Sequence, residues 1–276
     1  MTAVPLDPAV PLRRLTRRQR RRLTLGAQYA AAVTAVLGVA LLADWASLRE
    51  NFARSDIARE MFPGLLTVAL RNTVVYTVSG FVLGLSLAVL LALMRLSPVG
   101  PYRWFASAYV EVFRGLPALL IFVFVGVGLP LAFPGLVVPG GTTGKVALAL
   151  GLVSAAYMAE TLRAGIEAVP RGQTEAARSL GMSAPQAMAS VVLPQAFRVV
   201  VPPLTNELVL LFKDSSLVLF LGVSLGDREL AKFGRDLAST KANITPILVA
   251  GLCYLLITVP LGALARRLEA RTRKAR

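Results

Sequence analysis

Four long stretches of the sequence carry no charged residue, and they constrain the fold more than any other feature. They cover residues 23–43, 72–94, 115–144 and 242–265, which is 21, 23, 30 and 24 residues. An apolar helix needs roughly 20 residues to cross the ~30 Å hydrocarbon core of a bilayer, so each stretch is long enough. The alternating pattern of outer-membrane barrel strands is absent. The sequence therefore predicts an all-α membrane protein.

Composition and charge support this class. Of 276 residues, 55% are hydrophobic and 16% are charged, whereas soluble domains average about 25% charged residues. The net charge of +15 would suit nucleic-acid binding, but seven arginines lie in residues 13–22 and five arginines and one lysine in 266–276. Basic clusters that flank the spans are typical of cytoplasmic ends, so we expect no nucleic-acid partner. One cysteine, Cys253, and no histidine exclude a disulfide framework and a Cys/His zinc site.

The expected fold is a polytopic membrane helical bundle with six transmembrane helices. They are predicted over residues 25–43, 70–94, 112–133, 144–162, 206–226 and 244–265. Six crossings place both termini on the same side, and the basic flanks assign that side to the cytoplasm. The first helix could instead be a signal peptide, but its 21-residue run exceeds the usual apolar region of about 7–15 residues, so we expect it to stay uncleaved.

A polar segment over residues 163–205 is predicted to form two short helices on the cytoplasmic side. Pro170 and Gly172 precede the first, which Gly181 ends as a left-handed C-cap. Ser183-Ala-Pro-Gln186 has the spacing of a capping box and opens the second, which Leu193-Pro194 is expected to end. A rigid helical hairpin at the membrane face is suited to transmitting force or docking a partner.

This hairpin resembles the coupling loop of ABC importer permeases. The residues that carry the resemblance are Glu175, Ala176, Ala177, Gly181, Leu193 and Pro194. Other stretches are similar to polar amino-acid uptake permeases of the histidine, glutamine, arginine and glutamate type, among them Glu111-Val-Phe-Arg-Gly-Leu-Pro117 and Phe212-Lys-Asp-Ser-Ser-Leu217. Arg-Ala-Gly stands at 163–165 where the family more often has Arg-Gly-Gly. The resemblance covers residues 64–265.

The resemblance implies a five-helix permease core plus an extra N-terminal helix. The expected parts are a basic cytoplasmic tail (1–24), the extra helix with an outer loop (25–63), the permease domain (64–265) with its coupling loop (163–205), and a second basic cytoplasmic tail (266–276). The implied function is ATP-driven uptake of a polar amino acid through the cell inner membrane, with this chain as one half of the permease.

The implied partners are a cytoplasmic ABC ATPase subunit, an extracytoplasmic solute-binding protein and a second permease subunit, identical or homologous. ATP and Mg are expected on the ATPase, because this chain has no Gly-x-x-x-x-Gly-Lys-[Ser/Thr] loop. We therefore expect no enzyme activity, cofactor or metal in this chain. The sequence identifies neither the amino acid nor the choice between a homodimer and a heterodimer.

Two alternatives are weaker. A secondary transporter, which works without an ATPase, would be expected to show inverted repeats and would leave residues 163–205 unexplained. A membrane enzyme would need a nucleophile–base pair or a metal constellation, and the usual residues for both are missing.

Polar residues within the predicted spans are candidates for the translocation path, because an ionisable side chain there costs at least about 2.5–3.5 kcal/mol. The candidates are Asn72, Tyr76, Glu160, Lys213, Asp214 and Ser215. Structural roles are open for each: Asn72 and Tyr76 could join helices, Glu160 could pair with Arg163, and Asp214 or Ser215 could cap a helix that restarts near Leu217. Asn206 and Glu207 are expected to cap or anchor the start of the fifth helix.

Overall fold

A computed structural model describes residues 16–274 of the chain, so the outermost parts of the two predicted tails, residues 1–15 and 275–276, lie outside the description. The regular secondary structure of the described residues is helical throughout. Five helical stretches are long and apolar enough to cross a membrane, and a bent pair of helices can supply a sixth span. The predicted all-α bundle of membrane-length helices is confirmed.

The chain divides into two compact units, Met1–Glu50 and Asn51–Arg276. The first unit contains α1 (Arg17–Leu42), and α2 (Trp45–Phe52) crosses the boundary. α1 begins eight residues before the predicted position, because Thr16 and Gln19 form a capping box there. None of its residues is buried. Its 26 residues extend about 39 Å, enough to span a bilayer, and lipid is the environment that such an exposed apolar helix requires.

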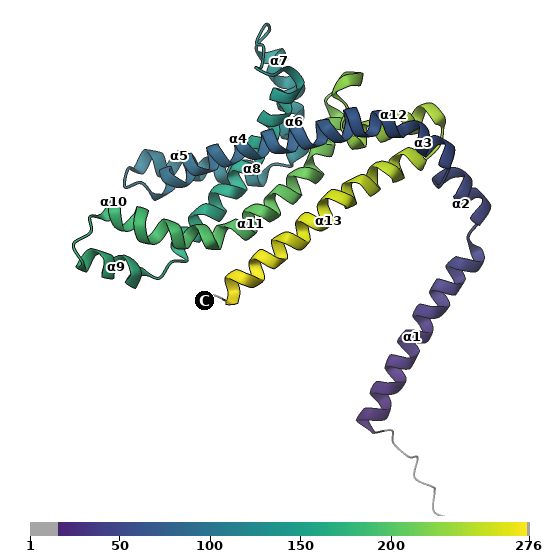
Figure 1. Cartoon of the computed structure of the whole chain (residues 1–276), viewed down its shortest axis with the longest axis horizontal. Helices are drawn as coiled ribbons and strands as arrows, with labels where there is room; N and C mark the ends of the chain where they lie inside the picture. The colour runs from purple at the N-terminus through teal and green to yellow at the C-terminus, as the bar shows by residue number, and fades with distance from the viewer. Residues whose placement is uncertain (1–15, 275–276) are drawn as a thin grey trace, which may run out of the picture. The chain divides into compact units, whose positions relative to one another are not determined.

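The second unit is built on four long helices that lie side by side: α4 (Arg71–Leu96), α8 (Gly141–Glu167), α11 (Leu193–Asp214) and α13 (Thr245–Lys274) (Figure 1). α4 and α8 share the most extensive contact, and Gly80 and Gly84 lie in it. A Cβ on Gly84 would lie 2.1 Å from Ser154 Oγ. The Gly-x-x-x-Gly spacing lets the two backbones approach closely, as is typical of membrane helix pairs.

The third predicted span, 112–133, is wrong in both its start and its continuity. α5 (Gly100–Gly115) is followed by α6 (Ala118–Val123), the π-helical η2 (Phe124–Gly128) and α7 (Leu129–Ala132), and the two parts are bent by 104°. Figure 1 shows α6 and α7 turning away from α5. Pro117 causes the break, because the residue before a proline is forced out of the helical region, and Leu116 has φ −90° and ψ 138°.

The fifth predicted helix starts too late, because Leu193-Pro194 does not end the preceding helix. α10 (Ala184–Ala187) and the π-helical η3 (Met188–Val192) continue directly into α11. A π-helical turn is wider than an α-helical one and can accommodate the missing N–H and the ring of a following proline. The π-helical η2 likewise ends two residues before a proline, Pro130, as η3 does before Pro194. Asn206 and Glu207 therefore lie inside α11 and do not cap it.

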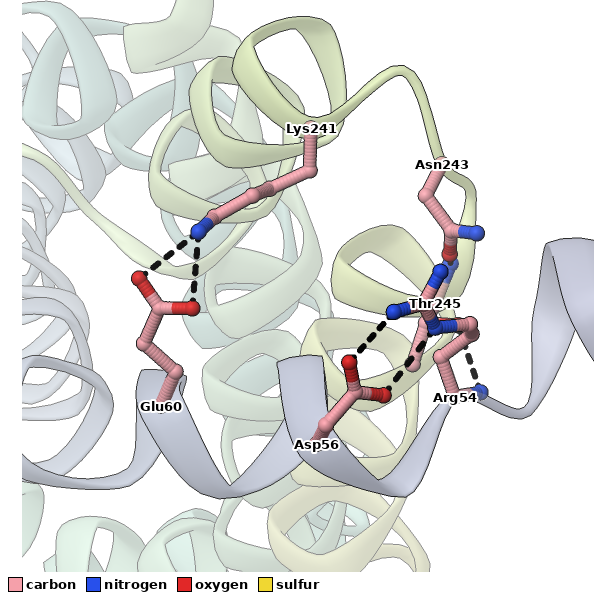
Figure 2. Close-up of polar contacts among 6 residues, drawn as sticks. All are labelled: Arg54, Asp56, Glu60, Lys241, Asn243 and Thr245. Carbon is pink, nitrogen blue, oxygen red and sulfur yellow. Dashed lines mark hydrogen bonds and ion pairs between the residues drawn. The ribbon is translucent and has the colours of Figure 1, made fainter.

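The segments 44–66 and 227–243, which connect the membrane-length helices, are largely helical as well. α3 (Ser55–Gly64) continues through the π-helical η1 (Leu65–Leu70) into α4, while η5 (Leu225–Asp227) and α12 (Leu230–Lys241) precede α13. Met61, Leu65, Leu230 and Phe233 form a second apolar cluster there. Figure 2 shows the polar contacts around it: Lys241 Nζ pairs with Glu60 at 2.7 Å, and the Arg54 N–H donates to Thr245 Oγ1 at 3.0 Å.

Candidate functional site

The helical hairpin begins with α9 (Arg171–Ser179), which ends in a Schellman motif. Gly181 has φ +90°. Its N–H donates to the Arg178 carbonyl at 3.0 Å, and the Met182 N–H donates to the Ala177 carbonyl at 3.2 Å. These are the two hydrogen bonds that define the motif. The predicted left-handed C-cap at Gly181 is confirmed.

Side chains fix the turn that follows. Arg178 Nη1 donates to the Met182 carbonyl at 3.1 Å. The predicted capping box is present, since the Ser183 N–H donates to Gln186 Oε1 at 2.8 Å and the Gln186 N–H donates to Ser183 Oγ at 3.4 Å. The direction of α10 relative to α9 is therefore set by hydrogen bonds to both backbone and side chains.

The two faces of the hairpin differ. Ala177 of α9 and Ala187 of α10 are buried, and α9 contacts α10 and η3. Leu180 is 82% exposed, and Glu175 and Ala176 are exposed too. Of Ala176, Ala177 and Leu180, the structure buries only Ala177. The hairpin is thus a small packed unit that presents an apolar side chain outward.

The hairpin is joined directly to the membrane helices. Gln195 Nε2 on α11 donates to Gln173 Oε1 on α9 at 3.4 Å. Leu193 and Pro194, both exposed, lie in the first turn of α11. Figure 1 shows α9 and α10 at the end of the second unit where α4 leads into α5, while α3 and α12 lie at the opposite end.

Three of the six path candidates form hydrogen bonds or ion pairs within the chain. Asn72 Nδ2 donates to the carbonyls of Gly226 and Arg228 at 2.8 and 3.1 Å, and the Tyr76 hydroxyl donates to the Asp227 carbonyl at 2.8 Å. These two side chains hold the η5 segment against α4. Glu160 forms ion pairs with Arg95 and Arg163 near the end of α8 that leads to the hairpin.

The other three candidates lie together near the end of α11, where a cavity of about 250 Å³ opens between α6, α8 and α11. Asp214 lines this cavity, as does Glu207. Lys213 is exposed and is not part of the lining, and Ser215 is buried, with Oγ donating to the Phe212 carbonyl at 2.7 Å. The full lining is Leu116, Ala118, Phe122, Leu150, Val153, Ser154, Tyr157, Glu207, Leu210, Leu211 and Asp214.

The cavity is apolar apart from a few groups, and two of these are carboxylates. Glu207 and Asp214 are seven residues apart on one helix, so they lie on the same face, about 10 Å apart along the axis. Among the described residues, no basic side chain lines the cavity with them. Such an arrangement is suited to a ligand that brings positive charge.

Sequence reasoning missed Glu207 as a cavity residue because it placed the start of the fifth helix at residue 206. That boundary assigned Glu207 to the membrane surface, where an acid needs no partner. The signal that could have found it is the i,i+7 spacing to Asp214, which places two acids on one helical face.

A further carboxylate, Glu229, is fully buried at the opposite end of the second unit. It accepts hydrogen bonds from the N–H groups of Ala231 and Lys232, both at 2.6 Å, and from the Tyr254 hydroxyl at 2.7 Å. Burial raises its pKa, which these hydrogen bonds only partly oppose. Glu229 caps α12 and ties it to α13. The sequence analysis did not single it out, although an acid directly before a helix is a cap signal.

Membrane-length helices, a rigid hairpin between two of them and a mainly apolar cavity with two acidic side chains beside the second are features of a multi-pass membrane transport subunit. A family model described as "Binding-protein-dependent transport system inner membrane component" matches residues 80–274, and the chain belongs to this family. It is a permease subunit of an ABC importer of the inner membrane.

The chain is similar to curated proteins over most of their length. It is 39% identical to the probable glutamine ABC transporter permease protein GlnM of Bacillus subtilis over 74% of this chain and 89% of the relative. It is 36% identical to the glutamate/aspartate import permease protein GltK of Escherichia coli over 72% and 90%. A solved structure titled "Crystal structure of an amino acid ABC transporter with histidines" matches with a TM-score of 0.69 and 32% identity, covering 78% of this chain and 96% of that one.

Proposed function

We propose that this chain and a second permease subunit form the path for ATP-driven uptake of a polar amino acid. Family membership supports the transport role, and the names of the relatives support the substrate class. The observation that carries the proposal is the cavity that contains Glu207 and Asp214 within the membrane-length helix Ala184–Phe220. Ionisable groups at such positions are costly and typically mark substrate pathways.

The cavity chemistry favours the ammonium end of the substrate. Two acids without a basic neighbour in the lining would attract a protonated amine, and Ser154 and Tyr157 add hydroxyl groups. The apolar lining residues would contact the aliphatic part of the substrate. An amino acid with a cationic side chain would use both acids, one for each ammonium or guanidinium group. We therefore place basic amino acids first among the candidate substrates.

We assign the hairpin to coupling with the ATPase subunit, which would bind and hydrolyse ATP with Mg. The exposed Leu180 supplies an apolar contact, and Glu175 and Ala176 lie exposed beside it. Gly181 sets the turn, while the buried Ala177 holds the hairpin together. Leu193 and Pro194 connect it to α11. The basic flanks support a cytoplasmic location for both termini. Within the second unit, α12 lies at the end opposite the hairpin, where a solute-binding protein would dock.

The test is uptake of a panel of labelled amino acids by membranes that contain the assembled transporter. We expect Asp214→Asn and Glu207→Gln to reduce uptake of the transported amino acid at least tenfold, while the complex with the ATPase remains intact. Glu269→Gln, which changes an exposed acid near the end of α13, is the matched control and should transport normally. Normal uptake by both cavity variants would refute the cavity as part of the path.

A further inference from the structure

A second cavity, of about 530 Å³, lies beside the hairpin, where the ends of α4 and α8 meet the start of α5. It is lined by Arg95, Gly100, Arg103, Trp104, Ser107, Arg163 and Glu167. We propose that this cavity binds the phosphate-bearing headgroup of an anionic phospholipid. Nothing in the coupling or translocation roles described above uses it.

The hydrogen bonds of the three arginines show which of them are available to a phosphate. Arg163 is committed to the protein, since it pairs with Glu160 through two nitrogens and with Glu167 through the third at 2.6 Å. Arg95 donates to Glu160 from Nη1, which leaves its remaining N–H groups without an acidic partner among residues 16–274. Arg103 is exposed and forms no ion pair with any described residue. A guanidinium group matches a phosphate in geometry as well as charge.

The aromatic side chains place the cavity at the level of lipid headgroups. Trp104 is 74% exposed, and its neighbours Tyr102 and Phe105 are exposed too. Exposed Trp and Tyr next to an apolar span are typical of the membrane–water interface. Basic pockets between membrane helices on the cytoplasmic side bind anionic headgroups, whose acyl chains remain in the bilayer. The combination favours a lipid over a phosphate taken from solution.

Binding here would act on the segment that leads to the hairpin. Glu167 is the last residue of α8, and α9 begins four residues later at Arg171. A headgroup held by Arg95 and Arg103 would join the α4–α5 turn to the end of α8. If the hairpin couples to the ATPase, as proposed above, anionic lipid should increase substrate-driven ATP hydrolysis. This last step depends on the proposed function, whereas lipid binding itself does not.

This chain has two tryptophans, and Trp45→Phe leaves Trp104 in the cavity as its sole tryptophan. A matched complex that also carries Trp104→Phe gives the background from the other subunits, so that the difference reports Trp104. We would reconstitute the permease–ATPase complex in phosphatidylcholine vesicles and measure quenching of Trp104 by brominated phosphatidylglycerol or brominated phosphatidylcholine. We expect the anionic lipid to quench at a lower mole fraction, by about fivefold for each arginine that contacts it.

Three variants test the assignment. Arg103→Gln should lower the preference for phosphatidylglycerol about fivefold, and Arg103→Lys should retain most of it. Arg267→Gln, which changes an exposed arginine near the end of α13, should leave it unchanged. Equal quenching by the two lipids, or an unchanged preference in Arg103→Gln, would overturn the proposal.

Two further measurements test whether the bound phosphate group belongs to a lipid or to a soluble anion, and whether lipid binding affects ATP hydrolysis. Relief of the quenching by inorganic phosphate at constant ionic strength would assign the cavity to a soluble anion and overturn the lipid proposal, while its absence supports a lipid. A drop in ATP hydrolysis of the Arg103→Gln complex in phosphatidylglycerol, with ATPase assembly unchanged, supports the coupling step. Unaltered hydrolysis overturns that step alone.

Discussion

Replacing Gly181 with alanine should weaken association with the ATPase subunit, and the structure sets the magnitude. At φ +90° an L-residue costs about 1–2 kcal/mol relative to glycine. A Cβ at this position would meet no atom within 4 Å, so the cost comes from the backbone alone. If the hairpin docks in the conformation described above, this cost corresponds to a 5- to 30-fold loss of affinity. Gly181→Val should lose more, because a β-branched residue is worse at positive φ.

Gly172 offers a matched control within the same hairpin. It lies in α9 with an ordinary φ, and a Cβ there would also meet no atom within 4 Å. Gly172→Ala should therefore leave the fold unchanged or stabilise the helix by about 0.5–1 kcal/mol. The two substitutions make the same chemical change and differ only in the backbone conformation that they require.

The assay has two parts. Titration of purified ATPase onto membranes with each variant gives the change in affinity, and hydrogen exchange at the Met182 amide reports the Schellman hydrogen bond. We expect both to change in Gly181→Ala and neither to worsen in Gly172→Ala. Equal affinity of the two variants, with faster exchange in Gly181→Ala, would show that the turn forms as described but does not determine docking. Equal exchange would refute the conformational argument itself.

Three other predictions concern packing, pH and topology. Gly84→Ala should lower the thermal stability of the solubilised protein by about 1–3 kcal/mol, because its Cβ would lie 2.1 Å from Ser154 Oγ, whereas Gly251→Ala, with open space, should not. Burial raises the pKa of Glu229 in the folded protein. The contribution of protonated Glu229 to the free energy of unfolding is therefore fully present below about pH 4.3 and is lost as the pH rises through the folded-state pKa. Glu229→Gln should remove this part of the pH dependence of unfolding. A reporter fused after Arg276 should be active only if it works in the cytoplasm, and alkaline phosphatase activity there would contradict the proposed orientation.

The sequence predicts a structural feature correctly where that feature depends only on residues that are neighbours in the chain. The left-handed turn at Gly181 and the capping box at Ser183 and Gln186 are local, and both are present. Membrane-length helices follow from local apolarity and were found as well. Two errors came from proline, whose effect depends on the turn before it. Pro117 follows an extended residue and breaks the span, whereas Pro194 follows a π-helical turn and is absorbed into α11.

The contacts of the path candidates could not be predicted, because they join residues distant in sequence. Asn72 and Tyr76 bond to the backbone of residues 226–228, more than 150 positions away. Glu160 pairs with Arg163, as one sequence alternative held, but also with Arg95 on α4. A polar side chain within a span needs a partner, but the sequence alone does not say whether that partner is a substrate or another part of the same chain.

The continuity of the helix Ala184–Phe220 bears directly on mechanism. The second short helix of the hairpin is the first part of the same helix that carries Glu207 and Asp214. From Ala184 to Glu207 the helix extends about 35 Å at 1.5 Å per residue. Had Leu193-Pro194 ended the hairpin, a flexible joint would separate the docking surface from the cavity. Because the helix runs on, a displacement of the hairpin would move one wall of the cavity with it, while α6 and α8 supply the other walls. Inserting two glycines after Leu193 should therefore uncouple ATP hydrolysis from uptake while leaving both ATPase binding and the cavity intact. Coupled transport in that variant would show that force reaches the cavity by another route.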